Sequence, residues 1–194
     1  MARTIRQRVK SPRWASYTLI VGLVFFTGWM VEAVRLAEVP SSSMEPTLKP
    51  GDVLLMRIDA YRHRTPARGD IVIFHDATNN GELLVKRVVG LPGETVFCQG
   101  GKVWINDRTL DEPYLKEPYY EAEPHHAALK NDELWVMGDN RNGSQDSRDL
   151  GPVETDNLVG RATAIILPAS RRGRLTSFSD PVLRPDGGRG APPP

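Results

Sequence analysis

A serine and a lysine in this chain could form a hydrolytic pair. Ser43 lies in the turn-rich segment Val39–Asp52 (VPSSSMEPTLKPGD), whose prolines could hold a hydroxyl in one direction. Lys86 interrupts the apolar run LLVKRVV, where strand alternation puts it on the face of Leu84 and Val88. If that face is buried, desolvation lowers the pKa of the lysine, by several units from about 10.4 in known cases. A neutral lysine can take the proton of a serine hydroxyl, so Ser–Lys is a working variant of the Ser–His–Asp arrangement.

A third polar segment, Gly138–Gly151 (GDNRNGSQDSRDLG), is dense in turn formers and hydrogen-bonding side chains. Taken singly, each segment has an ordinary explanation: a juxtamembrane linker for the serines, a gatekeeper on a strand edge for Lys86, and a hairpin loop here. An EF-hand beginning at Asp139 fails, because Arg141 and Gly143 would stand where oxygen ligands are needed. No single segment therefore decides the function.

Composition excludes several classes of protein. The one cysteine, Cys98, cannot form an internal disulfide, and the four histidines lack CxxC or HExxH spacing, so we expect no metal and no cofactor. The 25 Lys and Arg against 24 Asp and Glu give a net charge of +1, which argues against a nucleic-acid partner. This balance is a cancellation: residues 1–13 carry +5, residues 14–170 carry 15 basic and 22 acidic groups (−7), and residues 171–194 carry five basic and two acidic groups (+3).

The elements that must position these residues begin with a predicted membrane anchor. Residues 1–13 form a basic N-terminus, and eighteen uncharged residues follow from Trp14 to Val31, about 27 Å of helix. We expect a transmembrane helix over 14–34, since a cleavable secretory signal would have a shorter apolar core and a small-residue cleavage site. The basic flank predicts a single pass with the N-terminus in the cytoplasm and the rest of the chain outside it.

Short β-branched runs bounded by turn formers follow the anchor and predict a mostly β, antiparallel domain over 35–170, with a smaller β insertion at about 94–135. The predicted strands are Asp52–Arg57, Asp70–Phe74, Leu83–Val89, Glu94–Cys98, Lys102–Ile105, Glu133–Met137 and Arg161–Leu167. The acidic, proline-rich segment Asp111–His126 is expected to be a solvated loop. Residues 171–194, rich in Arg, Gly and Pro, are expected to be a disordered tail.

Four motifs occur together after the anchor. They are P-S-x-S-M-x-P-T-L at 40–48, R-G-D-I-V-x-F at Arg68–Phe74, K-R-V-V-G-L-P-G at Lys86–Gly93 and G-D-N-R-x-x-S-x-D-S-R at Gly138–Arg148. With them the chain, from Trp14 to about Leu167, resembles the type I signal peptidases, the membrane-bound Ser–Lys proteases that remove signal peptides from exported proteins. The resemblance implies an antiparallel β-sheet catalytic domain of the signal-peptidase and LexA-like kind.

The resemblance also implies roles for individual residues. Ser43 matches the nucleophile, Lys86 the general base, Ser144 the serine that orients the lysine, and Ser41 the hydroxyl that joins the Ser43 N–H in the oxyanion hole. The polar residues that would brace the site are Asp139, Asp146 and Arg148. A shallow pocket for small side chains at the −1 and −3 positions would be walled by Val39, Pro40, Met44, Leu48, Leu84 and Val85.

The implied setting is the bacterial plasma membrane. Its partners there would be the lipid bilayer and preproteins bearing signal peptides, close to the secretion translocon. The chain departs from the family in a short insertion between Gly93 and Gly138, in the single Cys98, and in Asp149-Leu150 where an aromatic pair is often found. The alternatives are a specialised relative, such as a conjugation pilin-maturation or spore-coat processing peptidase, and an inactive membrane-tethered adaptor, which would predict loss of Ser43 or Lys86.

Overall fold

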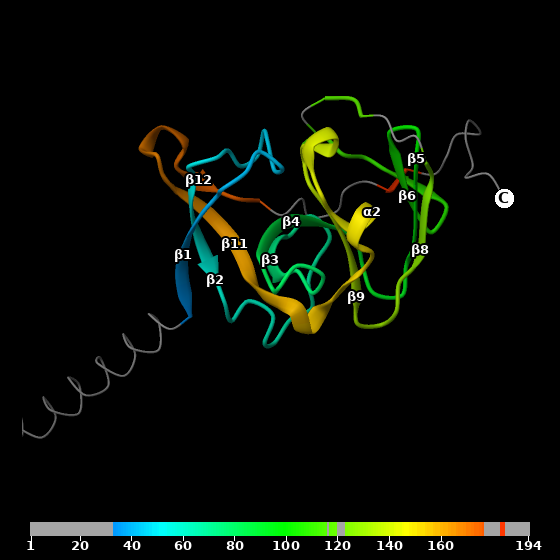
Figure 1. The fold of residues 1–194 in the computed structure, drawn as a ribbon, viewed down its shortest axis with the longest axis horizontal. Coiled ribbons are helices and arrows are strands. Elements are labelled where there is room, and N and C mark those ends of the chain that lie inside the picture. The colour runs from blue at the N-terminus through cyan, green and yellow to red at the C-terminus, as the bar shows by residue number, and fades with distance from the viewer. Residues whose placement is uncertain (1–32, 116, 120–122, 177–182, 185–194) are drawn as a thin grey trace, which may run out of the picture.

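The protein forms two antiparallel β-sheets in a computed structural model that describes residues 33–115, 117–119, 123–176 and 183–184 (Figure 1). The strands are β1 (Val34–Glu38), β2 (Val53–Arg57), β3 (Ile71–His75), β4 (Leu83–Gly90), β5 (Thr95–Gln99), β6 (Lys102–Ile105), β7 (Arg108–Leu110), β8 (His125–Ala128), β9 (Glu133–Met137), β10 (Val153–Glu154), β11 (Leu158–Leu167), β12 (Gly173–Arg174) and β13 (Leu183–Arg184). The short helical elements are η1 (Arg141–Gly143), α2 (Ser147–Leu150), η2 (Thr155–Asn157) and η3 (Ala169–Arg171).

Strand β4 lies inside the larger sheet, whose order is β1-β2-β11-β3-β4-β9-β10, with β12 paired to β11. Lys86 of β4 lies opposite Val72 of β3, and Val88 lies opposite Val136 of β9. Because β4 is bonded on both sides, a slip in its register would break two ladders and reverse the faces of its side chains. The pairing therefore fixes where Lys86 stands.

Strand β3 is buried on both faces. Ile71 and Ile73 belong to an apolar cluster with Met44, Leu48 and Leu54. Val72 and Phe74 point the other way, into a second cluster around β4 and β9. Burial on both sides explains why the sequence here is a continuous apolar run and does not alternate with polar residues.

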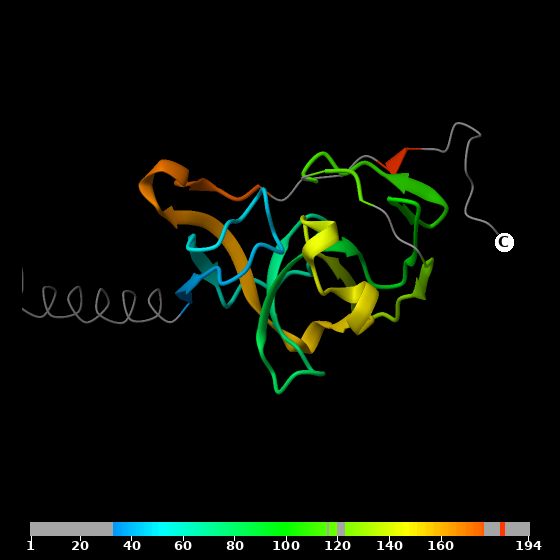
Figure 2. The same cartoon turned by 45° about the horizontal axis from the view of Figure 1, so that its top comes forward.

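The smaller sheet has the order β13-β7-β6-β5-β8 and lies on the side of the larger sheet away from β1 (Figure 2). A third apolar cluster joins the two sheets, because it combines Val96 and Ile105 of the smaller sheet with Trp135 and Met137 of β9. The approach is close at Gly90, where a Cβ atom would lie 2.5 Å from a methyl carbon of Val96. Only glycine fits at this junction.

The prediction of a mostly β, antiparallel chain is confirmed, and each of the seven predicted strands is present. Lys102–Ile105 and Glu133–Met137 have the predicted bounds, whereas the last predicted strand begins earlier, at Leu158. The smaller sheet, from β5 to β8, corresponds to the predicted insertion, and β9 belongs to the larger sheet. The short strands β7, β10 and β12 escaped prediction because two or three residues carry no periodic signal.

Two predictions for polar segments are wrong. The tail is not wholly disordered, since Arg171 bonds Asp52 at 2.9 Å, β12 pairs with β11 and β13 pairs with β7. The expected solvated loop buries Tyr114 and Tyr119, which are 7% and 3% exposed. In each case aromatic or charged side chains find partners in other elements, which composition does not reveal.

The predicted anchor lies mostly outside the described residues, as do the basic residues 1–13. Its expected end at residue 34 is wrong, because Val34 begins β1 and lies opposite Arg57 of β2. None of the helices in the part of the chain that the structure describes is long and apolar enough to cross a membrane.

Candidate active site

Ser43 is held in a compact series of turns between β1 and β2. The segment is closed at its base by a hydrogen bond from the Val39 N–H to the Asp52 carbonyl (2.9 Å), and inside it the Leu48 N–H donates to the Met44 carbonyl (2.9 Å). Val39, Met44 and Leu48 are 3% exposed or less and anchor the segment in the apolar core. Ser43 itself is 9% exposed, so the backbone and the core together fix the position of its hydroxyl.

Lys86 meets this hydroxyl from β4. Its Nζ lies 2.9 Å from Ser43 Oγ, and its side chain is 3% exposed, which confirms the expectation of a buried lysine. Burial lowers the pKa of Lys86 from its usual value, while the negative charge of Asp146 raises it and the positive charge of Arg148 lowers it. The net effect is a lowered pKa, so the neutral amine, the form that can accept a proton, becomes populated at lower pH than in an exposed lysine.

Ser41 lies on the exposed side of the same turn. Its hydroxyl donates to Ser43 Oγ at 3.3 Å. An oxygen on a carbon bonded to Ser43 Oγ would lie within reach of the Ser41 hydroxyl, which is the position that an oxyanion-hole donor needs.

The loop after β9 forms hydrogen bonds with the backbone around Ser43. The Asn140 N–H donates to the Ser43 carbonyl (3.0 Å), and its side-chain amide donates to the Ser42 carbonyl (3.2 Å). Gly138 lies between this backbone and Ser144, because a Cβ atom there would be 2.5 Å from the Ser43 carbonyl oxygen and 2.2 Å from Ser144 Oγ. Absence of a side chain at residue 138 lets the two serine-bearing segments approach each other.

The expected hydrogen bond between Ser144 and Lys86 is not formed. Ser144 Oγ is buried and makes no hydrogen bond of ordinary geometry within the described residues, but it lies close enough to the Asp146 carboxyl to help lower the pKa of that group. Lys86 Nζ instead donates to Ser43. The Ser144 hydroxyl lies against Gly138, near the Ser43 backbone and the Asp146 carboxylate.

Asp146 and Arg148 form an ion pair that supports the Gly138 loop. Asp146 Oδ1 accepts from Arg148 Nε at 2.9 Å, its Oδ2 accepts from the Gly138 N–H at 2.9 Å, and Asp146 also caps helix α2. Burial raises the pKa of the Asp146 carboxyl, but the hydrogen bonds and charge of Arg148 and the Gly138 N–H outweigh it, so the net pKa is lowered. Asp146 thus remains an anion close to Lys86.

Asp139 braces the site through a residue that the sequence did not single out, Arg87. The guanidinium donates to both Asp139 oxygens, at 2.8 and 2.6 Å, and the two side chains are 1% and 0% exposed. Thr47, from the segment that carries Ser43, donates to the same carboxylate. The sequence held a signal for this pair, because Arg87 follows Lys86 in an apolar run. If both faces of that strand are buried, the Arg87 guanidinium needs an acidic partner.

A second buried ion pair was also missed, in the segment expected to be a solvated loop. The Glu112 carboxylate accepts hydrogen bonds from both terminal nitrogens of Arg141. The Arg141 Nε donates to the Gly138 carbonyl at 3.1 Å. The Tyr119 ring lies 4.8 Å from the Arg141 guanidinium and the Tyr114 ring 4.1 Å from that of Arg87. The smaller-sheet insertion thus supports the Gly138 loop through Arg141.

The six expected pocket residues do not form one cluster. Val39, Met44 and Leu48 are core residues, with Val85 packed against them, whereas Leu84 packs against the cluster of Val72, Phe74 and Val88. Pro40 is exposed. Leu84 and Val85 separate because neighbouring residues of a strand point to opposite faces. The substrate pocket with these six residues as its walls stays a prediction.

An amine at hydrogen-bond distance from a serine hydroxyl can accept its proton, which is the task of the histidine in a Ser–His pair. No group of three His, Cys, Asp or Glu side chains suited to a metal occurs among the described residues. The residues that meet here come from the first turn segment, β4 and the loop after β9, which carry three of the four motifs found in the sequence.

Comparison with known proteins assigns the family. Residues 11–167 match the family described as signal peptidase, peptidase S26. The chain is 38% identical over 169 residues to the probable signal peptidase I-2 of Synechocystis (84% of this chain, 77% of the relative) and 37% identical over 166 residues to the signal peptidase I of Leptolyngbya laminosa (81% of each). A crystal structure of a signal peptidase I from Enterococcus faecalis is 31% identical, covering 50% of this chain and 97% of that chain, with a TM-score of 0.44. The chain belongs to the signal peptidase S26 family of serine peptidases.

Proposed function

We propose that this protein is a membrane-bound serine endopeptidase that removes signal peptides from exported preproteins through a Ser43–Lys86 pair. The observation that carries the proposal is the 2.9 Å contact between the buried Lys86 amine and Ser43 Oγ. Family membership and relatives named signal peptidase I support the choice of substrate.

The first chemical step joins Ser43 to the substrate. The neutral Lys86 amine takes the Ser43 proton while Oγ bonds to the scissile carbonyl carbon, and the carbonyl oxygen becomes an oxyanion. The Ser43 N–H and the Ser41 hydroxyl stabilise that charge. The Lys86 ammonium then gives its proton to the leaving amine as the C–N bond breaks, which releases the mature chain and leaves the signal peptide as an ester on Ser43.

Water completes the cycle. Lys86, neutral again, takes a proton from a water molecule that attacks the ester, and the proton passes to Ser43 Oγ as the ester bond breaks. Asp146 and Arg148 set the charge around the amine, and Ser144 assists by orienting it when substrate is bound. Because lysine is the base, the chemistry uses none of the four histidines.

The substrate would lie beside the half-buried Val85 and the exposed Pro40, with Val39, Met44 and Leu48 backing the wall from within the core. An apolar wall with little depth favours small side chains at the −1 and −3 positions. The basic residues 1–13 and the apolar segment from Trp14 support placement in the bacterial plasma membrane, with the catalytic domain outside the cytoplasm. Signal peptides that leave the translocon would then reach a site only a dozen residues beyond Val31.

The test is cleavage of a preprotein with an Ala-x-Ala site by the full-length chain in detergent. Ser43→Ala and Lys86→Ala should each abolish cleavage, because each removes one partner of the proton transfer. The matched controls are Ser42→Ala and Lys49→Ala, since both side chains are exposed and belong to the same turn segment. Cleavage by either of the first two variants at the rate of its control would refute the proposed pair.

A further inference from the structure

The smaller-sheet insertion reaches the arginines of the active site through three side chains, Glu112, Tyr114 and Tyr119. None of the three belongs to the four motifs found in the sequence. The Tyr119 ring faces two guanidinium groups at once, because its centroid lies 4.8 Å from that of Arg141 and 5.8 Å from that of Arg148. Both distances are within the range of cation–π attraction, which strengthens where the cation is shielded from water.

Tyr119 is held in place by the smaller sheet. Its side chain is buried, and its backbone packs against the turn between β5 and β6. A Cβ atom at Gly101 in that turn would overlap the Tyr119 carbonyl oxygen, and the φ of +78° at this residue also favours glycine. The position of the Tyr119 ring therefore depends on the packing of the smaller sheet.

The two arginines are bonded to each other as well as facing the same ring. Arg148 donates to the Arg141 carbonyl at 2.8 Å, and its Nε and one terminal nitrogen each donate to the Asp146 carboxylate at 2.9 Å. Arg141 is paired in turn with Glu112, an acid that the insertion supplies. The place of the Arg148 guanidinium is therefore set from the insertion by two routes, directly through Tyr119 and indirectly through Arg141.

The surroundings of the Lys86 amine differ from element to element. The first turn segment contributes the Ser43 hydroxyl, and β3 places the apolar Val72 opposite Lys86. The neighbouring Arg87 on the same strand is paired with Asp139. These contacts fix the amine, and the charges that act on it come from elsewhere.

Those charges come from helix α2 and its N-cap. Asp146, the N-cap, raises the pKa of Lys86, and Arg148, in the first turn, lowers it. Because a Coulomb interaction weakens with distance, any shift of the Arg148 guanidinium changes the pH at which Lys86 becomes neutral.

We propose that Tyr119 is a positioning residue of the peptidase site, whose ring holds the Arg148 guanidinium in its place beside Asp146. Glu112 secures the same arrangement through Arg141. By these contacts the smaller sheet controls the charge around the general base. The inference rests on the proposed serine–lysine pair and adds to it a residue that acts from outside the motifs.

The test measures kcat and KM for preprotein cleavage over a range of pH, with the full-length chain in detergent. Tyr119→Met removes the aromatic face but fills much of its space, and Tyr119→Leu repeats the change with a second apolar side chain. Tyr119→Phe keeps the ring that the two guanidinium groups face. This conservative variant should have the pH–rate profile of the wild type.

We expect the rise of kcat with pH to move to higher pH by about 0.5 unit or more in Tyr119→Met, since a displaced Arg148 lowers the pKa of Lys86 less. Below the midpoint of the rise this shift lowers kcat about threefold at a given pH, and KM should not change. An unmoved midpoint in both Tyr119→Met and Tyr119→Leu would overturn the proposal. An equal shift in Tyr119→Phe would overturn it too, because the ring would then not be the group that matters.

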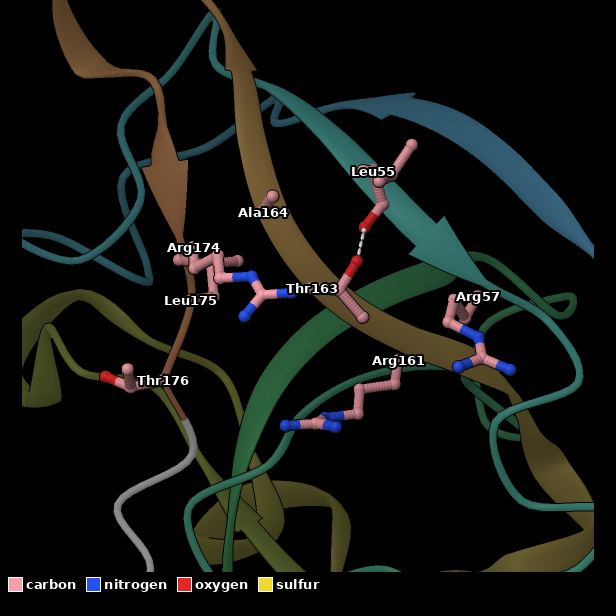
Figure 3. A pocket seen from close by; sticks show the side chains of 8 residues that line it. All are labelled: Leu55, Arg57, Arg161, Thr163, Ala164, Arg174, Leu175 and Thr176. Carbon is pink, nitrogen blue, oxygen red and sulfur yellow. Dashed lines mark hydrogen bonds between the residues drawn. The ribbon is translucent and has the colours of Figure 1, made fainter.

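Two controls separate this role from loss of stability and from loss of charge in general. Leu110→Ala leaves a cavity in the smaller sheet, so it should lower the unfolding temperature without moving the midpoint of the pH–rate profile. Arg174→Met removes a positive charge from a groove of about 480 Å³ that contains no residue of the active site (Figure 3), and it should not move the midpoint either. A shift in either control as large as that in Tyr119→Met would contradict the proposal.

A double variant tests the route through Arg148. Arg148→Met should itself move the rise of kcat to higher pH, and the addition of Tyr119→Met should move it no further, because the charge that the ring holds is already gone. Additive shifts would mean that Tyr119 acts by another route and would refute the inference.

Failure of the proposed pair and failure of this inference give different results. Retained cleavage by Lys86→Ala would remove the pair and this inference with it. A wild-type kcat that rises with pH, together with Tyr119→Met and Tyr119→Leu profiles that coincide with it, would overturn this inference alone.

Discussion

The buried pair Arg87–Asp139 offers the sharpest test of how the site is held together. Both side chains are 1% exposed or less, and the guanidinium donates hydrogen bonds to both carboxylate oxygens. Asp139→Asn keeps the shape of the side chain but leaves an uncompensated charge in the core, which costs about 3–5 kcal/mol in comparable buried pairs. At about 2–4 °C for each kcal/mol in a domain of this size, the unfolding midpoint should fall by about 6–20 °C.

A double-mutant cycle separates the pair from its surroundings. Arg87→Met and Asp139→Asn should each destabilise the protein strongly, and the double variant should be less destabilised than the sum of the two by about 1 kcal/mol or more. Thermal unfolding of the full-length protein in detergent measures all three. Asp59→Asn, at an exposed ion pair with Arg57, should barely move the midpoint. Additive effects in the cycle, or a midpoint for Asp139→Asn equal to that of Asp59→Asn, would refute the reasoning.

Two further predictions concern the pair itself. Since only the neutral Lys86 accepts a proton, kcat should rise with pH through the lowered pKa of Lys86 and level off above it. Asp146→Asn should move this rise to lower pH, because it removes a negative charge that raises the pKa of Lys86. A pH–rate profile that moves to higher pH would contradict this electrostatic account. Gly138→Ala should lower kcat at least tenfold, because its Cβ would overlap Ser144 Oγ and the Ser43 carbonyl oxygen; wild-type kcat in single-turnover cleavage would show that the close approach is dispensable.

Much of the fold was predictable because its strands are buried in a simple way. The apolar runs of β2, β3 and β4 have β-branched residues bounded by turn formers, and each was found within a residue or two of its true bounds. Strand β1 was missed because Val34–Glu38 directly follows a long apolar stretch and carries two charges. Its strand form depends on the partner β2, which local pattern cannot reveal.

The candidate site was predictable in its reactive atoms and not in its supports. Ser43 and Lys86 stand in distinct motifs, and an amine inside an apolar run signals unusual chemistry. Glu112 and Arg141 gave no such signal, because an acid in a proline-rich acidic stretch and an arginine in a polar turn both look solvated. Their burial arises only when the smaller sheet packs beside the loop after β9.

The sequence by itself determined the class of strand-rich fold, the identity of the reactive side chains and the family motifs, because residue type and short-range spacing suffice for each. The tertiary structure decided the 2.9 Å contact of Lys86 with Ser43, the pairing of Arg87 with Asp139 and the position of Ser144 against Gly138. Each of these joins residues far apart in the chain. Their distances and burial follow from sheet register and packing, which only the folded chain defines.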